Sequence, residues 1–467
     1  MWLPEIASSA GPKYLSISAA LGRDIETGRL RPGDRLPPQR DLAEALGIDL
    51  GTVTRAYAEA RRQGLIDADG RRGSFVREAH GILGGTLAAE QIAPFDTGMN
   101  LPPLPLRSSL PEAYAAGLRE ILAGPAAANR LQYQPAGGAP GDRQAGADWL
   151  ATRGIAADED NVLVVSGGQT ALHAIAHAAL EPGDVVCTGR FAYPGWLSIA
   201  RRLGLQVLAV DSDAEGIDPA ALDRACAAQA LAGQPVRALY VVPTNDSPTT
   251  ATMGVERRRA VAEVARRHEL KIIEDDAYGR LAAEPLPPLA SLAPERTWHV
   301  ASLSKIVSPA LRVAYLRAPS LRDAWRLAAD VHATTVMAPP LNVALATRWL
   351  TDGSLQSLVD EVRAECVARR AIADELLPAG SFRAEPEGYH LWIPLPEGLA
   401  PTELVSALAP SGLSVVSGEA FVADPADTAR AVRVSIGGSL SRERLTRALS
   451  LLDALLHHRG SRMTPLV

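Results

Sequence analysis

The chain has 467 residues, of which 47% are hydrophobic and 21% charged, and its net charge is −6 at pH 7. This composition is that of a globular protein and excludes a disordered or fibrous chain, while the length predicts two domains or more. The negative net charge excludes a polybasic nucleic-acid binder, so any contact with DNA must come from a local surface.

The N-terminal residues and the cysteines indicate the compartment. The first residues lack a basic region followed by an apolar run, so they do not resemble a signal peptide. The longest uncharged apolar stretch, "VHATTVMAPPLNVALAT", is interrupted by prolines and is too short and too polar for a membrane span. Cys187, Cys226 and Cys366 have neither metal-like nor disulfide-like spacing. We therefore expect a cytoplasmic protein without membrane contact and without a metal site.

Residues 1–78 are predicted to form a small helical domain closed by a hairpin. "LPPQRDLAEALG" is typical of a short helix that ends at Gly47, and the longer helix after it has Asp49 as a candidate cap. In "LIDADGRRGSFV", Asp69 and Gly70 supply the turn chemistry of a β-hairpin. Two helices separated by a short turn and followed by such a hairpin indicate a winged helix-turn-helix.

This domain is expected to bind a double-stranded DNA operator. The first turns of the second helix and the tip of the wing are the places where base edges and phosphates are reached. The candidate DNA-contacting residues are Arg40, Thr52, Thr54, Arg55, Arg71 and Arg72. Any single arginine among them could instead belong to a solvated face, so the prediction depends on the motif as a unit.

Residues 79–94 lose periodicity, are rich in Gly and Ala, and are interpreted as a linker. In residues 95–467, apolar β-branched runs alternate with helical stretches, which predicts an α/β fold with a mainly parallel sheet covered on both faces. From about residue 355 the pattern changes to a long helix, short strands and a last helix. We interpret this part as a smaller C-terminal α+β subdomain.

Polar motifs follow several of the predicted strands, where open α/β sheets bind their ligands. In "VVSGGQTAL", Gly168 and Gln169 would present backbone N–H groups and a positive helix end to a phosphate. In "IIEDDAYGRL", the Asp275 carboxylate can pair with a protonated ring nitrogen, and Tyr278 can donate a phenolic hydrogen bond. Each motif alone is also compatible with a plain strand-to-helix turn or a solvated acidic turn.

Lysine is rare in this chain. Lys13, Lys271 and Lys305 are its only lysines among 47 basic residues. Unlike arginine, a buried lysine can lose its proton and attack a carbonyl, so Lys305 in "SLSKIVSPALR" is a candidate nucleophile as well as a possible surface lysine. Tyr193 in "FAYPGW" could stack on a planar ligand or pack within its turn. Taken together, the motifs describe pyridoxal 5′-phosphate held as a Schiff base at Lys305.

Two sets of motifs resemble known families. "SLSKIVSPALRVAYL", "DDAYG", "YVVPTNDSPTTATM" and "YQPAGG" resemble the aminotransferase fold, type I of the pyridoxal-phosphate (PLP) enzymes, and "LPPQRDLAEALGIDLGTVTRAYAEARRQGLI" with "GRRGSFV" resembles the winged helix-turn-helix of GntR regulators. In this order the two parts resemble the MocR-type transcriptional regulators over essentially the whole chain.

The resemblance implies a role for each matching residue. Lys305 matches the Schiff-base lysine and Asp275 the partner of the pyridine nitrogen. Tyr278 matches the phenol that hydrogen-bonds O3′ of the ring, and Tyr193 matches the stacking aromatic. The positions that hold the phosphate are occupied by Gly168, Gln169, Ser302 or Ser304, and Arg312.

Three further positions bear on assembly and substrate. Tyr133 matches a tyrosine that reaches the phosphate from the other subunit, so the resemblance implies a homodimer with shared sites. Arg433 matches the arginine that binds an amino acid's α-carboxylate. Ser247 stands where the family usually has an asparagine that touches O3′, which puts efficient transamination in doubt more than cofactor binding.

The leading hypothesis is a transcriptional regulator that senses a small amine, an amino acid or the cofactor itself through the Schiff base at Lys305. The alternative is a working aminotransferase with an appended DNA-binding domain. A third hypothesis is a DNA-binding protein whose large domain only dimerises.

Overall fold

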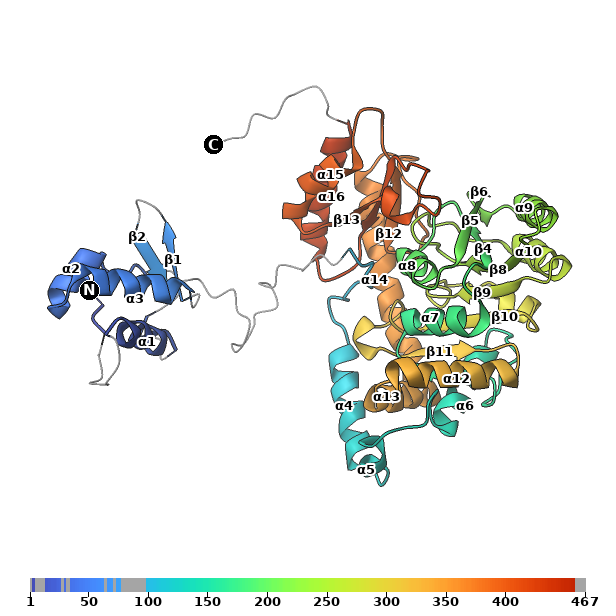
Figure 1. The fold of residues 1–467 in the computed structure, drawn as a ribbon, viewed down its shortest axis with the longest axis horizontal. Helices are drawn as coiled ribbons and strands as arrows, with labels where there is room; N and C mark the ends of the chain where they lie inside the picture. The colour runs from blue at the N-terminus through green and yellow to red at the C-terminus, as the bar shows by residue number, and fades with distance from the viewer. Residues whose placement is uncertain are drawn as a thin grey trace. The chain divides into compact units, whose positions relative to one another are not determined.

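The computed structural model describes residues 2–4, 13–26, 29–30, 34–62, 65–69, 73–76 and 98–457. The chain divides into two compact units, residues 1–92 and 93–467, and each is described by itself (Figure 1). The predicted linker at residues 79–94 lies outside the described residues, so its limits stay a prediction.

The N-terminal unit contains a helix-turn-helix followed by an antiparallel hairpin, as the sequence predicts. Its elements are α1 (Lys13–Glu26), α2 (Gln39–Leu46), α3 (Leu50–Arg62), β1 (Ile66–Asp69) and β2 (Gly73–Val76). Gly47, with a φ of 61°, ends α2 because a left-handed residue there stops the helix. Asp49 caps α3 as expected, since its carboxylate accepts hydrogen bonds from the N–H and the hydroxyl of Thr52. Leu42, Val53 and Tyr57 are buried in the small core of this unit.

The second unit is built on a seven-stranded sheet with the strand order β3-β11-β10-β9-β8-β4-β5. The strands are β3 (Val162–Val165), β4 (Val185–Gly189), β5 (Gln206–Val210), β8 (Val236–Val241), β9 (Lys271–Asp275), β10 (Thr297–Ser302) and β11 (Ala314–Arg317). Only β11 runs antiparallel to its neighbours, so the prediction of a mainly parallel sheet is confirmed.

Both faces of this sheet are buried. Ile272 and Ile273 are adjacent on β9 but belong to two different hydrophobic cores, because successive side chains of a strand point to opposite faces. The helices that surround the sheet are α4 (Leu110–Ala123), α5 (Ala127–Arg130), α6 (Pro140–Ala151), α7 (Gly168–Ala179), α8 (Pro194–Arg202), α9 (Pro219–Leu231), α10 (Val255–Arg267), α11 (Leu289–Leu292), α12 (Leu321–Thr335) and α13 (Pro340–Asp352). A short hairpin, β6 (Ser212–Asp213) and β7 (Gly216–Ile217), and a 3-10 turn, η2 (Pro309–Leu311), complete this part.

The C-terminal part has the predicted α+β character. The long helix α14 (Ser354–Leu376) leads to an antiparallel three-stranded sheet in the order β12-β14-β13 (Figure 1). The remaining elements are β12 (His390–Pro394), α15 (Pro401–Leu408), η3 (Ala409–Ser411), β13 (Ser414–Ser417), η4 (Gly418–Phe421), β14 (Ala431–Ser435) and α16 (Arg442–His457). Among the described residues no helix is long and apolar enough to cross a membrane.

Candidate functional site

Lys305 and Asp275 meet at the carboxyl ends of two parallel neighbours, β9 and β10. Val300 of β10 is in register with Asp275, the last residue of β9, and Lys305 lies in the turn that follows β10. Parallel strands end at the same edge of a sheet, so these two residues from separate motifs share one place. Each influences the pKa of the other through its charge.

The Lys305 amine is prepared for nucleophilic chemistry. Burial, together with the nearby positive charge of Arg433, lowers the pKa of Lys305 to about 8. Its Nζ donates a 2.6 Å hydrogen bond to the carbonyl oxygen of Asn100, and the hydroxyl of Tyr389 donates to the Lys305 carbonyl at 3.0 Å. A substantial fraction of the amine is therefore neutral in mildly alkaline solution, as a nucleophile requires.

Asp275 is a buried carboxyl that can face a cationic ring nitrogen. Burial raises the pKa of Asp275 to about 6, although the hydrogen bond from Tyr240 at 3.0 Å has the opposite effect. The ring of Tyr240 is in turn held by stacking on Trp196, with centroids 4.5 Å apart. A positive charge beside Asp275 would favour its ionised form.

A buried ionic network fixes the backbone on either side of Asp275. The Glu274 carboxylate accepts hydrogen bonds from the N–H groups of Leu289 and Ala290 at 2.6 and 2.9 Å and contacts His299 Nδ1 at 2.8 Å. Asp276 forms an ion pair with Arg153. The end of β9 is therefore anchored by the side chains of both neighbours of Asp275.

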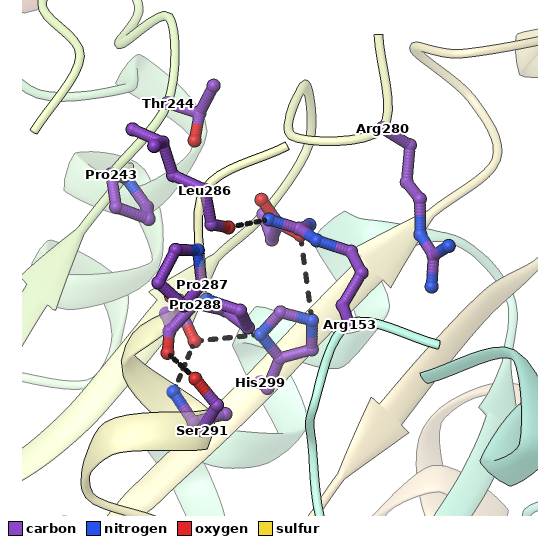
Figure 2. A network of polar contacts seen from close by, with 12 residues as sticks. Arg153, Pro243, Thr244, Arg280, Leu286, Pro287, Pro288, Ser291 and His299 are labelled. Atoms are coloured by element: carbon purple, nitrogen blue, oxygen red, sulfur yellow. Dashed lines mark hydrogen bonds and ion pairs between the residues drawn. The ribbon is translucent and has the colours of Figure 1, made fainter. Parts of the chain in front are cut away.

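Arg153 connects this network to the following loop. In Figure 2 its guanidinium lies beside Leu286, whose carbonyl oxygen accepts a 2.8 Å hydrogen bond from Arg153, with His299 close by and Arg280 further off. Burial raises the pKa of Asp276, but the positive charges of Arg153 and His299 outweigh burial and hold it below its ordinary value. Asp276 is thus an ionised carboxylate inside the protein.

The amino end of α7 lies against the Arg312 guanidinium. Gly167 precedes α7 with a φ of 85°, and a Cβ at Gly167 would lie 2.5 Å from the Arg312 guanidinium. Only glycine therefore leaves room for this approach. Gly168 begins the helix, and a Cβ there would lie 3.6 Å from that of Ser302. Ser304 Oγ is buried without a hydrogen-bond partner among the described residues.

Tyr193 and Gln169 meet at Gly195. Gln169 donates a hydrogen bond to the Gly195 carbonyl at 3.1 Å, and a Cβ at Gly195 would lie 2.3 Å from the ring of Tyr193. Burial raises the pKa of Tyr193, and Asp275 adds to this effect while Arg312 opposes it. The aromatic ring therefore lies within electrostatic reach of both the Asp275 carboxyl and the Arg312 guanidinium.

Arg433 extends from β14 of the C-terminal part and is 4% exposed. It donates a 2.6 Å hydrogen bond to the carbonyl oxygen of Gly98, and its guanidinium lies 5.1 Å from the centroid of the Phe421 ring. A guanidinium in such surroundings suits the recognition of a carboxylate.

Tyr278 belongs to a polar cluster around Asn100 that sequence reasoning missed. Asn100 Nδ2 donates to the Tyr278 hydroxyl at 3.1 Å and contacts His390 Nδ1 at 3.1 Å, while Ser435 donates to Asn100 Oδ1 at 2.7 Å. Burial raises the pKa of Tyr278 to about 12, so this phenol stays protonated. The sequence around Asn100, "GMNLPP", has no motif that would have identified the residue.

Two expected residues make no described side-chain hydrogen bond with this cluster. Tyr133 is 83% exposed in the single chain and contacts none of the other candidate residues through a described hydrogen bond. Ser247 is buried in the loop after β8, where it precedes Pro248 across a cis peptide bond. Neither placement tests the role that the resemblance implies.

Four of the six DNA-contact candidates, Arg40, Thr52, Thr54 and Arg55, lie on α2 and α3. Arg40, Thr54 and Arg55 are exposed. The hydroxyl of Thr52 donates to the Asp49 cap. The single hydroxyl hydrogen of Thr54 has two acceptors within reach, Gln39 Oε1 at 2.9 Å and the carbonyl of Leu50 at 3.0 Å. The two hydroxyl hydrogens are therefore already used within the protein. Of the remaining candidates, both wing-tip arginines, Arg71 and Arg72, lie outside the described residues.

The arrangement in the large unit has a definite chemical capacity. The Lys305 amine lies within electrostatic reach of Asp275, Arg312 and Arg433, and the Tyr193 ring lies within reach of the same three groups. An aldehyde with a cationic ring and a phosphate fits these groups, and an incoming carboxylate fits the Arg433 guanidinium. Such a unit, joined in one chain to a helix-turn-helix, defines the class of transcriptional regulators with an aminotransferase-like domain.

Comparisons with known proteins give the family. Residues 13–76 match the bacterial regulatory proteins of the gntR family, and residues 98–452 match aminotransferase class I and II. The HTH-type transcriptional regulator TauR of Rhodobacter capsulatus is 30% identical over 440 residues, which are 86% of this chain and 88% of TauR. The HTH-type pyridoxine biosynthesis transcriptional regulator PdxR of Corynebacterium glutamicum is 27% identical over 422 residues, 86% of this chain and 87% of PdxR. The chain belongs to this family of GntR-type regulators with an aminotransferase class I and II domain, the MocR type.

Solved structures agree on the fold of the large unit. Kynurenine aminotransferase of Pyrococcus horikoshii has a TM-score of 0.70 and 24% identity, covering 78% of this chain and 92% of that protein. LysN, the α-aminoadipate aminotransferase of Thermus thermophilus, was solved with N-(5′-phosphopyridoxyl)-L-leucine and has a TM-score of 0.66 and 26% identity, covering 77% and 92%. The prediction of an aminotransferase-like fold type I domain is confirmed.

Proposed function

We propose that this regulator binds PLP covalently, through a Schiff base to Lys305, and senses a small amine, an amino acid or the cofactor itself. The observation that supports this most is the convergence of Lys305, whose pKa burial lowers to about 8, with the buried carboxyl of Asp275. The name of its relative PdxR refers to pyridoxine biosynthesis, which supports the cofactor as one candidate effector.

The residues present fit the cofactor. Ser304 Oγ is a buried hydroxyl without a partner among the described residues, and the Arg312 guanidinium lies against the amino end of α7. These groups would hold the phosphate together with Gly168, Gln169 and Ser302. Tyr193 would stack on the ring.

Each remaining residue has a separate task. When bound, the cofactor supplies an electrophilic aldehyde carbon and an electron-accepting ring. Lys305 would bind that carbon as a neutral amine, and Asp275 would hold the proton of the ring nitrogen in place. Tyr278 would donate a hydrogen bond to O3′. With the shorter Ser247, the contact of the usual asparagine to O3′ would be lost or mediated by water. Arg433 would bind the carboxylate of an amino-acid effector.

A ligand changes DNA affinity only if it binds two arrangements of the protein unequally. Entry of a carboxylate at Arg433 would alter its hydrogen bond to the Gly98 carbonyl. Release of the Lys305 amine would alter the contact of this residue with the Asn100 carbonyl. These contacts are a structural source of the required difference.

The test uses the full chain loaded with PLP. A visible absorbance band that borohydride fixes covalently is expected for the wild type and not for Lys305→Ala. Operator affinity is then measured by fluorescence anisotropy at fixed salt, with PLP alone and with a panel of amino acids and amines. An unchanged affinity under every condition would contradict the sensing function, and a missing band would contradict the cofactor.

A working aminotransferase is the second candidate. Lys305, Asp275 and Arg433 would supply the amine, the carboxyl and the guanidinium that such a reaction uses. Sustained oxo-acid production from an amino donor over many turnovers would favour the enzyme. A single conversion of the cofactor to its amine form without turnover would favour the sensor.

We also propose a homodimer with shared sites, because Tyr133 is 83% exposed and apolar Leu131 beside it is 60% exposed. A mixture of Lys305→Ala and Tyr133→Ala chains tests it. Mixed dimers would contain one complete site, made by Lys305 of one chain and Tyr133 of the other. Recovery of phosphate-dependent PLP retention in the mixture, absent from either variant alone, is expected; no recovery would contradict the shared site.

A further inference from the structure

Asn100 occupies the centre of the polar cluster that surrounds the Tyr278 hydroxyl. It is 3% exposed, and its side chain has a described partner on each of its two polar atoms. We infer that Asn100 is a positioning residue for the cofactor, acting through Tyr278 in place of the asparagine that Ser247 replaces. This inference rests on the proposed cofactor.

The Asn100 amide has a definite orientation within the cluster. The Ser435 hydroxyl donates to Asn100 Oδ1 at 2.7 Å, and the NH₂ group is on the opposite side. Its two hydrogens match two acceptors, the Tyr278 hydroxyl and His390 Nδ1, both at 3.1 Å.

The histidine agrees with this assignment. Burial, and the positive charge of Arg433 as a lesser cause, lower the pKa of His390 to about 3, so its ring is neutral. With Nδ1 as acceptor, the ring proton is on Nε2, where the carbonyl oxygen of Asp246 lies 3.1 Å away. The hydrogens of the Asn100 amide, of His390 Nε2 and of the Ser435 hydroxyl therefore each have an acceptor, and the Asp246 carbonyl, which can only accept, fixes the direction of these bonds.

This direction determines what Tyr278 can do. Because Asn100 donates to its phenol oxygen, Tyr278 keeps its own hydrogen for donation to another acceptor. Hydrogen bonds in a chain polarise one another, so the bond from Asn100 makes the phenol a stronger donor. At O3′, this would strengthen the one phenolic contact that remains without the usual asparagine.

The backbone of Asn100 is held as firmly as its side chain. The carbonyl of the next residue, Leu101, accepts from Gly438 N at 3.1 Å, and a Cβ at Gly437 would lie 1.9 Å from that same oxygen. The carbonyl of Asn100 accepts from Lys305 Nζ. One residue thus contacts both the amine and the phenol of the site.

The experiment measures the pH midpoint of the visible band of the PLP-loaded chain. A hydrogen bond to O3′ stabilises its negative charge and favours loss of the proton that O3′ shares with the neighbouring nitrogen. Weakening that bond therefore raises the midpoint. Asn100→Ala is expected to raise it by about one pH unit. The groups near Tyr278 that also bear charge or titrate are unchanged in this variant; they are Asp275, Arg433, Tyr193, Tyr389 and His390.

A double-mutant comparison separates this role from a structural one. Tyr278→Phe is expected to raise the midpoint at least as much, and adding Asn100→Ala to it should give no further rise, because Asn100 acts through Tyr278. Asn161→Ala is the matched control. Asn161 immediately precedes β3, and its amide oxygen accepts a hydrogen bond from Asp158 N at 3.1 Å. Its midpoint should equal that of the wild type.

Two results would overturn the inference. One is an unchanged midpoint in Asn100→Ala, and the other is full additivity with Tyr278→Phe. Should Asn100→Ala not accumulate in folded form, Ser435→Ala releases the amide oxygen while keeping the amide, and a smaller rise is expected; no rise overturns the inference as well. A wild-type chain without any band would instead contradict the proposed cofactor, so the two failures are distinguishable.

Discussion

The Lys305 amine donates a 2.6 Å hydrogen bond to the carbonyl oxygen of Asn100, which is 205 positions earlier in the chain. Burial lowers the pKa of this amine from 10.5 to about 8. The lowered value predicts a pH dependence for the capture of PLP by the cofactor-free protein, since only the neutral amine attacks a carbonyl.

The rate of appearance of the visible band should rise about tenfold per pH unit below pH 8 and level off above it, because the neutral fraction does so. Stopped-flow absorbance at constant ionic strength measures this rate. A small-molecule amine with an ordinary lysine pKa is the control and should continue to accelerate to about pH 10.5. A protein rate that follows the control to that pH would show that the Lys305 pKa is not lowered.

Arg433→Lys should weaken the binding of an amino-acid effector by about 10- to 100-fold, because an ammonium group cannot form the paired hydrogen bonds of a guanidinium. The visible band of bound PLP should persist, since Arg433 does not hold the cofactor. Titration of the spectral change with amino acid measures the affinity. Arg430→Lys is the matched control, because Arg430 is exposed and donates to the Pro396 carbonyl. Equal affinities in the two variants would remove Arg433 from the effector site.

Arg153→Met should destabilise the large unit by about 3–5 kcal/mol, because it leaves the Asp276 carboxylate buried without its cation. The shift in the urea midpoint of this unit, followed by tryptophan fluorescence, measures the effect. Arg259→Met removes a 2.6 Å pair with Glu256 in which both side chains are more than half exposed, and it should cost less than about 1 kcal/mol. Similar losses in both variants would show that burial of the pair is unimportant.

Arg55→Ala should weaken binding to an operator duplex by about 10- to 100-fold, the usual cost of losing a contact to a base. Anisotropy with a duplex selected by the wild-type chain from random DNA, at fixed salt, measures it. Arg61→Ala is the control, since Arg61 is exposed near the other end of α3. An unchanged affinity for Arg55→Ala would exclude this residue from DNA recognition.

The fold could largely be predicted from periodicity. The runs around Val162 and Val185 are apolar and buried, as strands covered on both faces must be, and each is a strand of the sheet. The position of β11 could not be predicted in this way. It lies between β3 and β10 and runs antiparallel to both. The hydrophobic pattern of a strand does not indicate which strands lie next to it or in which direction it runs.

The site was predictable where a motif follows a strand. Asp275 and Lys305 were identified because each is a charged residue at, or shortly after, the end of a predicted strand. Asn100 and Arg153 were missed, since their partners are 178 and 123 positions away and no spacing in the sequence relates them. The polar contacts of Asn100 and Arg153 are important because both residues are shielded from water, and a buried polar group needs a partner inside the protein. Only the folded chain shows which residues are shielded in this way.

In the ligand-free molecule the Gly98 carbonyl already accepts a hydrogen bond from the Arg433 guanidinium. Under the proposed function, a carboxylate must displace this internal competitor. The apparent affinity then equals the intrinsic affinity multiplied by the fraction of molecules in which the carbonyl has moved away. The strength of one backbone contact would thus determine the effector concentration at which transcription responds. Substitutions near Gly98 could then retune this threshold without touching any group that meets the effector.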